Sequence, residues 1–590
     1  MIVPMKKLIL LCLEREVQPT LEEVGRFGQV HVEHLRRPEG EDLEGERARL
    51  ERTKRALALL PEPEEQADPE CSGEEIIASL EDLDGRRHRT REMLEKLRGE
   101  RKRIAPFGEF DPLQVRELAN RDIHIRLYKT APKQPVPEPD DAVVRVFRRA
   151  KGEAFFAVIS RSLPKIEAEP IDLPDMSLSE MDEWIRRAER ELQEIAQSLK
   201  RCACYRHVLE DRLHLLETRV HFHEVERGME QAEPVAVLKG FCPAEREEEL
   251  RGLAARRGWG VILTDPEPED RVPTLIRNPR WVRPIKAIFD MIGITPGYRE
   301  VDVSMFFLIF LSIFFAILVG DAGYGALFLG MTLAVRAKWP HAPGHLFHLL
   351  ILMSSCTIVW GVLTGTYFGT GLVPGPLERL QIGWLTGEGA DAHLMLLCFV
   401  IGAVHLSLAH GWNAIRLMNS VRALSQIGWI GVTWSMFFAV RYMVLNEPFP
   451  PAAGWTLLGS AVLVLLFMNP PREIKKNGFG YVTFPLDLIN NFVDLVSYVR
   501  LFAVGAATFA VAHSFNQMAL ETGYDGVVSG IVATLIIFLG HTMNILLAAM
   551  AVMVHGVRLN ALEFSSHVGM EWSGTEYRPF RYEADSAGNT

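Results

Sequence analysis

Charged residues are distributed very unevenly along this 590-residue sequence, and that split constrains the fold more than any other feature. The first 300 residues contain 110 Asp, Glu, Lys and Arg side chains, whereas the last 290 contain only 29. Segments that lie in lipid exclude charges because a charged side chain is costly there. We therefore expect a hydrophilic arm, residues 1–300, followed by a membrane domain, residues 301–590.

Net charge, cysteine usage and the N-terminal residues limit the class of protein and the cellular compartment in which the arm lies. The formal net charge is -11 and the isoelectric point is near 6.0, which argues against a nucleic-acid-binding protein. The seven cysteines are scattered without a CxxC pair, so we expect neither disulfides nor a metal site. We also expect no cofactor. Lys6 and Lys7 precede only six apolar residues before Glu14, too few for the apolar core of a signal peptide. We expect the arm to stay in the cytosol.

Strand-like segments at both ends of the arm predict two small α/β lobes in an α+β arm. Residues 7–13 and 28–35 read as strands with an amphipathic stretch between them, and a similar pattern returns over residues 234–265. Residues 122–172 contain three further strand-like pieces. The predicted lobes are residues 1–70 together with 232–290, and a distal lobe of residues 107–175.

Two segments between these lobes carry heptad seams that predict a coiled coil. In residues 75–106 the seam runs over nine positions, three of them polar. In residues 178–226 it runs over twelve, and such a helix would extend roughly 60 Å. Because the segments flank the distal lobe, we expect them to pair antiparallel; the alternative is a long solvated helix with no partner. The second seam consists of Met181, Ile185, Ala188, Leu192, Ile195, Leu199, Cys202, Arg206, Leu209, Leu213, Leu216 and Val220.

Eight apolar runs follow residue 300 and predict an all-α polytopic membrane domain of about eight transmembrane helices. The first two runs are short and separated by GDAGYG at residues 320–325, which we interpret as a tight hairpin. With a cytosolic arm, the cytosolic loops then contain seven Lys or Arg and the external loops one or two, which fits the positive-inside rule and puts both termini in the cytosol. The seven are Arg336, Lys338, Arg416, Arg422, Arg472, Lys475 and Lys476. The runs are 304–319, 322–335, 346–370, 392–414, 426–445, 454–468, 486–518 and 527–562.

The last two runs are longer than the roughly 20 residues that cross a bilayer, so these helices must tilt or protrude. Each contains an arginine. Arg500 lies one turn after Ser497 and six positions after Asp494. Since an ionisable residue inside a span is costly, we expect Arg500 to face a partner or water.

The final run has one face of small and polar residues at helical spacing, and this face ends at Arg558. The alternative for Arg558 is a snorkelling or packing arginine near the cytosolic end of its helix. Three further histidines of the membrane domain, His405, His410 and His513, are interpreted as helix-packing groups. The polar face consists of His541, Asn544, Ala548, Ala551, His555 and Arg558.

Four motifs resemble those of a known family. They are GDAGYG at 320–325, WGVLTGTYFG at 360–369, SYVRLFAVGAA at 497–507 and GHTMNILLAAMAVMVHGVRLNALEF, which ends at residue 563. The chain is similar over its whole length to the membrane-embedded a/I subunit of rotary V-type and archaeal-type ATPases. Its lack of large insertions resembles the prokaryotic subunit I, which implies a multi-pass protein of a prokaryotic plasma membrane.

The resemblance also implies site residues. Arg500 matches the family's essential stator arginine, and Arg558 matches the second arginine of the last helix. Eukaryotic members have a glutamate ten residues before the second arginine and a histidine eight after the first, where this chain has Ala548 and Thr508. The half-channel candidates are therefore chosen from the polar residues of this chain. They are Glu563, His555, His541, Asn544, Asp494 and Ser497.

By the same resemblance the chain is a non-catalytic stator subunit that provides ion half-channels, with protons as the expected ion. Its expected partners are the lipid bilayer, a proteolipid rotor ring, peripheral-stalk coiled-coil subunits, the central-stalk cap subunit of the rotor and, indirectly, the ATPase head. The sequence has no GxxxxGK[ST] motif, and the dipeptide Gly-Lys does not occur in it. We therefore expect no ATP site and no catalytic residue in this chain.

An independent secondary transporter with a cytosolic regulatory arm is the alternative. Such a protein would carry inverted repeats and paired broken helices. No convincing repeat relates spans one to four to spans five to eight. A membrane scaffold without transport would leave Arg500 and the polar face at 541–558 unexplained.

Overall fold

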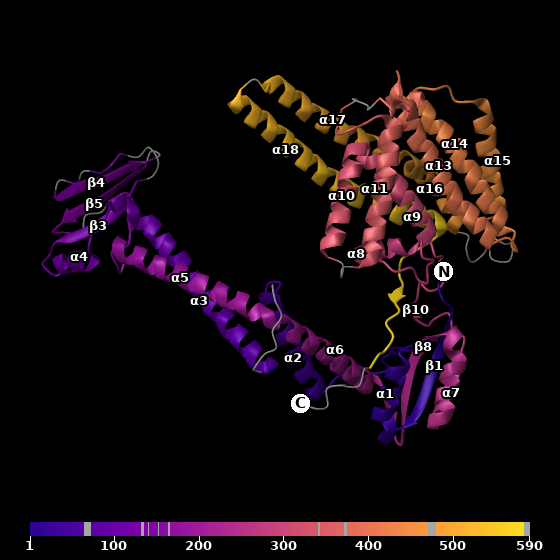
Figure 1. Cartoon of the computed structure of the whole chain (residues 1–590), viewed down its shortest axis with the longest axis horizontal. Coiled ribbons are helices and arrows are strands. Elements are labelled where there is room, and N and C mark those ends of the chain that lie inside the picture. Colours follow the sequence, from indigo (N-terminus) through magenta and orange to yellow (C-terminus); the bar gives the residue numbers. More distant parts are fainter. Residues whose placement is uncertain are drawn as a thin grey trace. The chain divides into compact units, whose positions relative to one another are not determined.

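The structure is a computed structural model that carries side chains (Figure 1). Three of the loop cations counted above, Arg472, Lys475 and Lys476, lie outside the described residues. The described residues are 1–63, 72–130, 135–137, 139, 141–150, 153–162, 166–339, 343–370, 375–469, 479–524 and 526–582.

The chain divides into two compact units. One consists of residues 1–9 and 240–579, and the other of residues 10–239 and 580–590. The larger unit thus includes the segment 240–300, which precedes the apolar half of the sequence.

Long helices dominate the smaller unit. Helix α3 (Gly73–Ile104) packs against α5 (Leu178–Cys202), and α2 (Glu41–Leu59) packs against α6 (Arg206–Gly228), as Figure 1 shows. A 3-10 turn, Ala203–Tyr205, separates α5 from α6. Helices α3 and α5 each begin with a capping box, in which a serine side chain and a glutamate satisfy the first free N–H groups of the helix.

The predicted heptad positions supply the apolar contacts of these helices. Eight of the twelve positions of the second seam are buried. Sequence analysis did not anticipate α2, because its sequence is strongly polar and only four of its nineteen residues are buried. The buried residues of the second seam are Met181, Ile185, Ala188, Ile195, Leu199, Leu209, Leu216 and Val220.

The described residues form two larger sheets and a two-stranded one, in which β10 (Pro273–Thr274) pairs with β11 (Thr575–Glu576). A four-stranded antiparallel sheet of order β4-β5-β3-β6 follows α3 with the short helix α4, Pro112–Ala119. A second sheet has the order β2-β8-β1-β9, with β7 paired to β8, and the boundary between the two units falls within β1 and β8. The strands are β1 (Met5–Leu13), β2 (His31–Glu33), β3 (His124–Lys129), β4 (Ala142–Ala150), β5 (Glu153–Ser160), β6 (Glu169–Ile171), β7 (Glu230–Ala232), β8 (Val235–Pro243) and β9 (Gly260–Thr264). The flanking helices are α1 (Val17–Phe27) and α7 (Glu247–Arg257).

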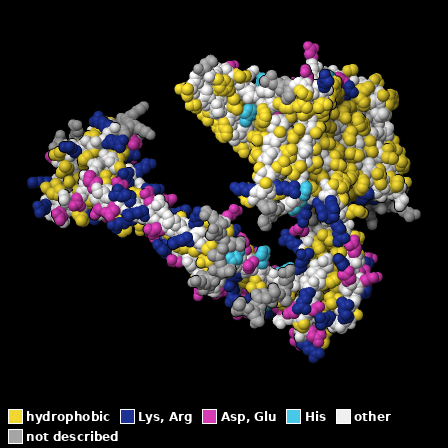
Figure 2. Space-filling model, viewed as in Figure 1, with side chains coloured by type: hydrophobic (Ala, Val, Ile, Leu, Met, Phe, Trp, Pro, Cys, Tyr) yellow, Lys and Arg dark blue, Asp and Glu magenta, His cyan; other side chains and the backbone are white. Residues whose placement is uncertain are grey.

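The larger unit contains a bundle of apolar helices, and hydrophobic side chains cover much of its outer face in Figure 2. Every predicted apolar run overlaps a helix, although run 346–370 extends past the end of α11 at Thr364 and run 486–518 is divided between α16 and α17. Within the described residues, five helical segments are long and apolar enough to cross a membrane: Gly344–Thr364, Ala390–Arg416, Arg422–Leu445, Gly480–Thr522 and Val527–Val568. The count of about eight crossings stays a prediction, since α9, α10 and α15 are shorter. The elements are α9 (Ser304–Val319), α10 (Ala322–Lys338), α11 (Gly344–Thr364), α12 (Gly383–Thr386), α13 (Ala390–Arg416), α14 (Arg422–Leu445), α15 (Pro451–Phe467), α16 (Phe479–Val496), α17 (Val499–Thr522), α18 (Val527–Ala551) and α19 (Ser565–Val568).

Two of the sequence motifs meet at the start of α10. Asp321 is 4% exposed, and its carboxylate accepts hydrogen bonds from the backbone N–H groups of Gly323, Tyr324, Phe368 and Gly369 at 2.7–3.1 Å. A carboxylate at a helix start stabilises the free N–H groups of the first turn. Asp321 thereby ties GDAGYG to the end of WGVLTGTYFG.

Candidate functional site

Irregular turns in the last two long helices position the charged residues. A two-residue interruption between α16 and α17 places Arg500 in the first turn of α17. After α18 the chain widens into two π-helical turns, Val552–Gly556 and Leu559–Phe564. Such turns are rare and frequently occur at functional sites. In this geometry Arg558 and Glu563, five residues apart, lie on the same side of the helix, with Arg558 Nε 3.7 Å from Glu563 Oε1.

A single carboxylate, that of Glu563, holds both arginines. Its Oε1 accepts hydrogen bonds from Arg500 Nη2 at 2.6 Å and from Ser497 Oγ at 3.2 Å. The Glu563 side chain is 5% exposed, whereas those of Arg500 and Arg558 are 23% and 54% exposed. A guanidinium does not lose its proton in proteins. The cluster therefore presents two permanent cations toward the surface and anchors them on one buried carboxylate.

A second set of polar side chains begins next to this cluster at Asp494. Asp494 Oδ2 lies 3.1 Å from His567 Nε2, and His567 Nδ1 lies 2.9 Å from His410 Nε2. His410 Nδ1 in turn lies 2.9 Å from Gln426 Oε1. The Asp494 carbonyl accepts from Ser497 Oγ at 2.7 Å, so the backbone of Asp494 connects this set to the arginine cluster.

The number of protons on this chain of side chains depends on how the Gln426 amide is turned. If the Gln426 oxygen faces His410, the neutral rings of His410 and His567 each donate their N–H in the direction of Gln426. The Nε2 atom of His567 then carries no proton, so its contact with the Asp494 carboxylate needs one additional proton. With the amide nitrogen toward His410, neutral rings donate toward Asp494 and satisfy an ionised carboxylate. Rotation of one amide is thus compatible with the gain or loss of one proton.

The other predicted polar residues form a separate cluster around Tyr324. The Tyr324 hydroxyl lies 2.6 Å from His541 Nδ1 and accepts a hydrogen bond from Asn544 Nδ2 at 3.0 Å. His541 Nε2 lies 3.1 Å from Asn516 Oδ1, and Asn516 Nδ2 donates to the Phe368 carbonyl at 2.7 Å. His541 precedes Arg558 by 17 residues, which corresponds to about 25 Å along a helix.

The structure therefore brings together Arg500, Arg558, Glu563, Ser497 and Asp494. It places His541 and Asn544 elsewhere. His555 lies in the first π-helical turn, three residues before Arg558, and its buried Nδ1 has no hydrogen-bond partner in the described part of the chain.

Sequence reasoning missed the groups that join these residues. His567, Gln426, Tyr324 and Asn516 were not selected. His410, which was interpreted as a helix-packing group, does stack on Trp429, and it also faces His567. For His567 and Gln426 the signal in the sequence was limited to a polar side chain at or just beyond the end of a predicted apolar run, which does not show the histidine that each one faces. His405 does pack, since its ring stacks on Phe310 and Phe564 with centroids 3.8 and 4.3 Å apart.

The described residues contain no group of three or more His, Cys, Asp or Glu side chains that could hold a metal ion.

Comparison with known proteins shows where the chain belongs. No protein-family model matches it. It is 31% identical to "V-type ATP synthase subunit I 1" of Treponema pallidum over 98% of this chain and 100% of that protein. It is 29% identical to "V-type ATP synthase subunit I" of Borreliella burgdorferi over 98% of this chain and 99% of that protein. A crystal structure of the cytoplasmic N-terminal domain of subunit I, homolog of subunit a, of V-ATPase covers 44% of this chain and 99% of that structure. Its sequence identity is 18% and its TM-score is 0.21, an overlap too low to establish a common fold.

The fold and the arginine cluster define a multi-pass membrane protein with an α+β arm and a charged site on its last two long helices. The full-length relatives show that the chain belongs to the subunit I family of V/A-type ATP synthases.

Proposed function

We propose that this chain is the ion-translocating membrane stator of a rotary V/A-type ATPase or ATP synthase, that it crosses the membrane eight times, and that both termini are cytosolic. The observation that carries the proposal is the buried Glu563, whose single carboxylate orients Arg500 and approaches Arg558 on helices with exposed apolar surfaces. The chain itself neither binds nor hydrolyses ATP, and the chemistry of ATP belongs to other subunits.

The proposed mechanism rests on the cost of charge in lipid. A carboxylate on each helix of a rotor ring must be protonated or bind a cation while it faces the bilayer, because a bare charge is too costly there. When that carboxylate reaches Arg500, the fixed positive charge favours its ionised form and it releases its ion. Arg500 also blocks a direct path between the two half-channels, so that an ion crosses only when the ring turns.

Glu563 has a positioning role in this proposal. It fixes the Arg500 guanidinium at 2.6 Å and leaves 23% of the arginine side chain exposed toward a partner. A rotor carboxylate then competes with Glu563 for the same guanidinium. The internal carboxylate keeps Arg500 in place while no rotor carboxylate is present.

The two polar clusters are the proposed half-channels. With the arm in the cytosol, the Asp494, His567 and His410 set lies toward the cytosolic end of the helices, and the Tyr324, His541 and Asn544 set lies toward the external end. Histidine and carboxylate side chains can pass protons along hydrogen bonds. Protons are therefore the proposed ion.

The proposed partners of the membrane domain are the lipid bilayer and the proteolipid rotor ring. The proposed partners of the arm are the peripheral-stalk coiled-coil subunits and the central-stalk cap subunit, and the arm acts as the tether of the stator. The long packed helices of the smaller unit suit a tether, because their buried apolar seams make them stiff.

The test is ATP-driven ion uptake in vesicles that contain the assembled complex, with Arg500→Ala compared with the native chain. We expect the assembled variant to lose transport. Arg416→Ala, which removes an arginine at the end of α13 outside the cluster, is the matched control and should keep transport. Normal transport by an assembled Arg500→Ala complex would overturn the proposal. Co-purification adds a second test, because a secondary transporter would be isolated without ATPase subunits.

A further inference from the structure

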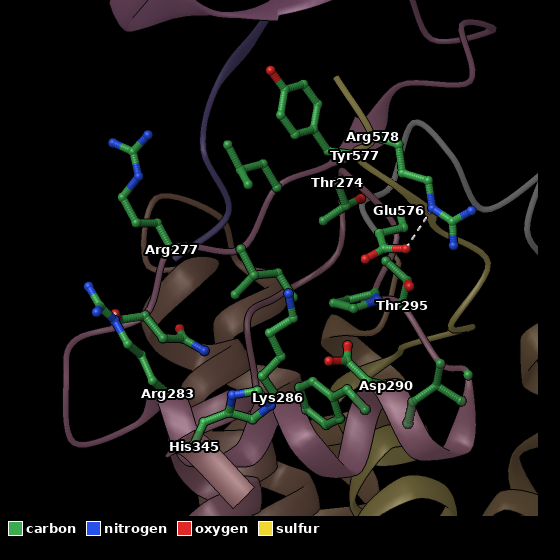
Figure 3. A pocket seen from close by; sticks show the side chains of 17 residues that line it. Thr274, Arg277, Arg283, Lys286, Asp290, Thr295, His345, Glu576, Tyr577 and Arg578 are labelled. Atoms are coloured by element: carbon green, nitrogen blue, oxygen red, sulfur yellow. Dashed lines mark hydrogen bonds and ion pairs between the residues drawn. The ribbon is translucent and has the colours of Figure 1, made fainter. Parts of the chain in front are cut away.

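A cavity of about 690 Å³ lies in the larger unit, apart from the arginine cluster. Figure 3 shows it between the segment that precedes α9, the start of α11 and the segment that follows α19. This volume is within the range of small-molecule sites. Four Lys or Arg residues line it against two carboxylates, so its walls carry a net positive charge.

Within the described part of the chain, two of these cations form no ion pair with a carboxylate. Arg277 pairs with Glu245 at 2.7 Å and Arg578 pairs with Glu576 at 2.9 Å. Arg283 and Lys286 form no ion pair within the described residues; Arg283 Nε donates only to the Asn278 carbonyl, at 3.2 Å. Lys286 and Asp290 are four residues apart on the short helix α8 (Lys286–Ile292), and both line the cavity together with Arg283 and His345 (Figure 3). The charges of Arg283 and Lys286 together outweigh the single charge of Asp290, so the wall that they form with His345 favours an anion.

The cavity lies where a membrane surface would be. His345 is in the first turn of α11, one of the helices long and apolar enough to cross a membrane, so the cavity lies at the level of one helix end. Large apolar side chains of the same segments are exposed: Trp281 and Met291 at 55% each and Leu346 at 41%. Aromatic and apolar side chains beside cations are typical of segments that lie in the headgroup layer. Figure 2 shows Lys and Arg side chains gathered at this edge of the hydrophobic bundle.

We propose that this cavity binds the phosphate headgroup of an anionic phospholipid, with Arg283, Lys286 and His345 as its ligands. A planar guanidinium and an ammonium group both form charge-assisted hydrogen bonds with phosphate oxygens. The apolar side chains near the cavity favour a lipid over a soluble phosphate, because they offer contact surface to acyl chains.

The test measures binding of dioctanoylphosphatidylglycerol to the full chain in a neutral detergent by isothermal titration calorimetry. We expect the double variant Arg283→Gln/Lys286→Gln to bind about tenfold or more weakly, since it loses two charge-assisted contacts. Arg336→Gln/Lys338→Gln removes the same charge from the end of α10, outside the cavity, and should bind like the native chain. The charge-conserving variant Arg283→Lys/Lys286→Arg should keep most of the affinity.

Two further ligands distinguish the source of the phosphate. Dioctanoylphosphatidylcholine, which has no net charge, should bind weakly. Inorganic phosphate that binds as tightly as the anionic lipid would overturn the lipid assignment. Equal lipid affinity in the native chain and in a folded Arg283→Gln/Lys286→Gln variant would overturn the site, and so would an equal loss in the Arg336→Gln/Lys338→Gln control. The thermal unfolding midpoint of each variant without lipid verifies that it is folded.

Discussion

The molecule contains the same chemical pair, arginine with a carboxylate, in two very different settings. In the helical part of the smaller unit, Arg101 pairs with Asp182 and Arg52 pairs with Glu81, and all four side chains are 37–48% exposed. In the bundle, Arg500 pairs with a Glu563 side chain that is 5% exposed. Exposed pairs contribute little to stability because water and salt screen them. A buried pair becomes costly when one partner is removed, since an unpaired charge then remains. The exposed pairs therefore contribute only slightly to the pairing of the helices, whereas the buried pair fixes Arg500 in place.

The largest expected effect comes from breaking the buried pair. Glu563→Gln leaves Arg500 and Arg558 without a carboxylate, and we expect a loss of about 3–5 kcal/mol in the stability of the bundle. The measurement is thermal unfolding of the full chain in detergent. Glu571→Gln, at an exposed glutamate outside the cluster, should change little. The double variant Glu563→Gln/Arg500→Gln should lose less than the two single losses combined, because it removes both partners together. Strict additivity would show that the two residues are not coupled.

Breaking the exposed pair of Arg101 and Asp182 should cost far less stability, and that cost should depend on the salt concentration. Replacement of Arg101 by Gln is expected to cost about 0.2–1 kcal/mol of local stability in α3 and α5. Hydrogen exchange of α5 amides in the full chain reports this difference. At about 1 M salt the difference between native chain and variant should disappear, because the screening length falls to about 3 Å. A difference that persists at high salt would mean that Arg101 acts through packing.

The smallest effect is a pH dependence of the same pair. The hydrogen bond from Arg101, together with its charge, lowers the pKa of Asp182 in the folded chain. A carboxyl group whose folded-state pKa is depressed stabilises the fold above its unfolded-state pKa of about 3.9, and this stabilisation is lost as the pH falls through the folded-state value. Protection of α5 amides should therefore weaken below about pH 4. In Arg101→Gln this part of the pH dependence should be absent; the same pH profile in both chains would contradict the assignment.

Periodic features of the sequence predicted which faces of the helices are buried. The sequence did not show which residues far apart in the chain contact one another. Eight of the twelve heptad positions from Met181 to Val220 are buried, because the buried face of a helix follows from the spacing of its apolar residues. Helix α2 was missed because it buries few apolar residues and derives its place from α6. The hydrogen bond between His410 and His567 joins residues 157 positions apart, and no local pattern in the sequence encodes such a contact. Arg500 could be selected because a lone cation in an apolar run is conspicuous, but its partner could not be chosen among the nearby polar residues.

The two π-helical turns after α18 also carry a consequence for how the last helix evolved. A π turn accommodates one more residue than an α turn, so each is equivalent to a single-codon insertion that the helix absorbed without breaking. Such an insertion rotates everything beyond it by about 100° about the helix axis. The polar face read from residues 541–558 therefore does not continue in register to His567, and the extra residue turns that histidine toward Asp494. Loss of one residue from Leu559–Phe564 would remove the second of these insertions, rotate His567 back by about 100° about the helix axis and separate it from Asp494.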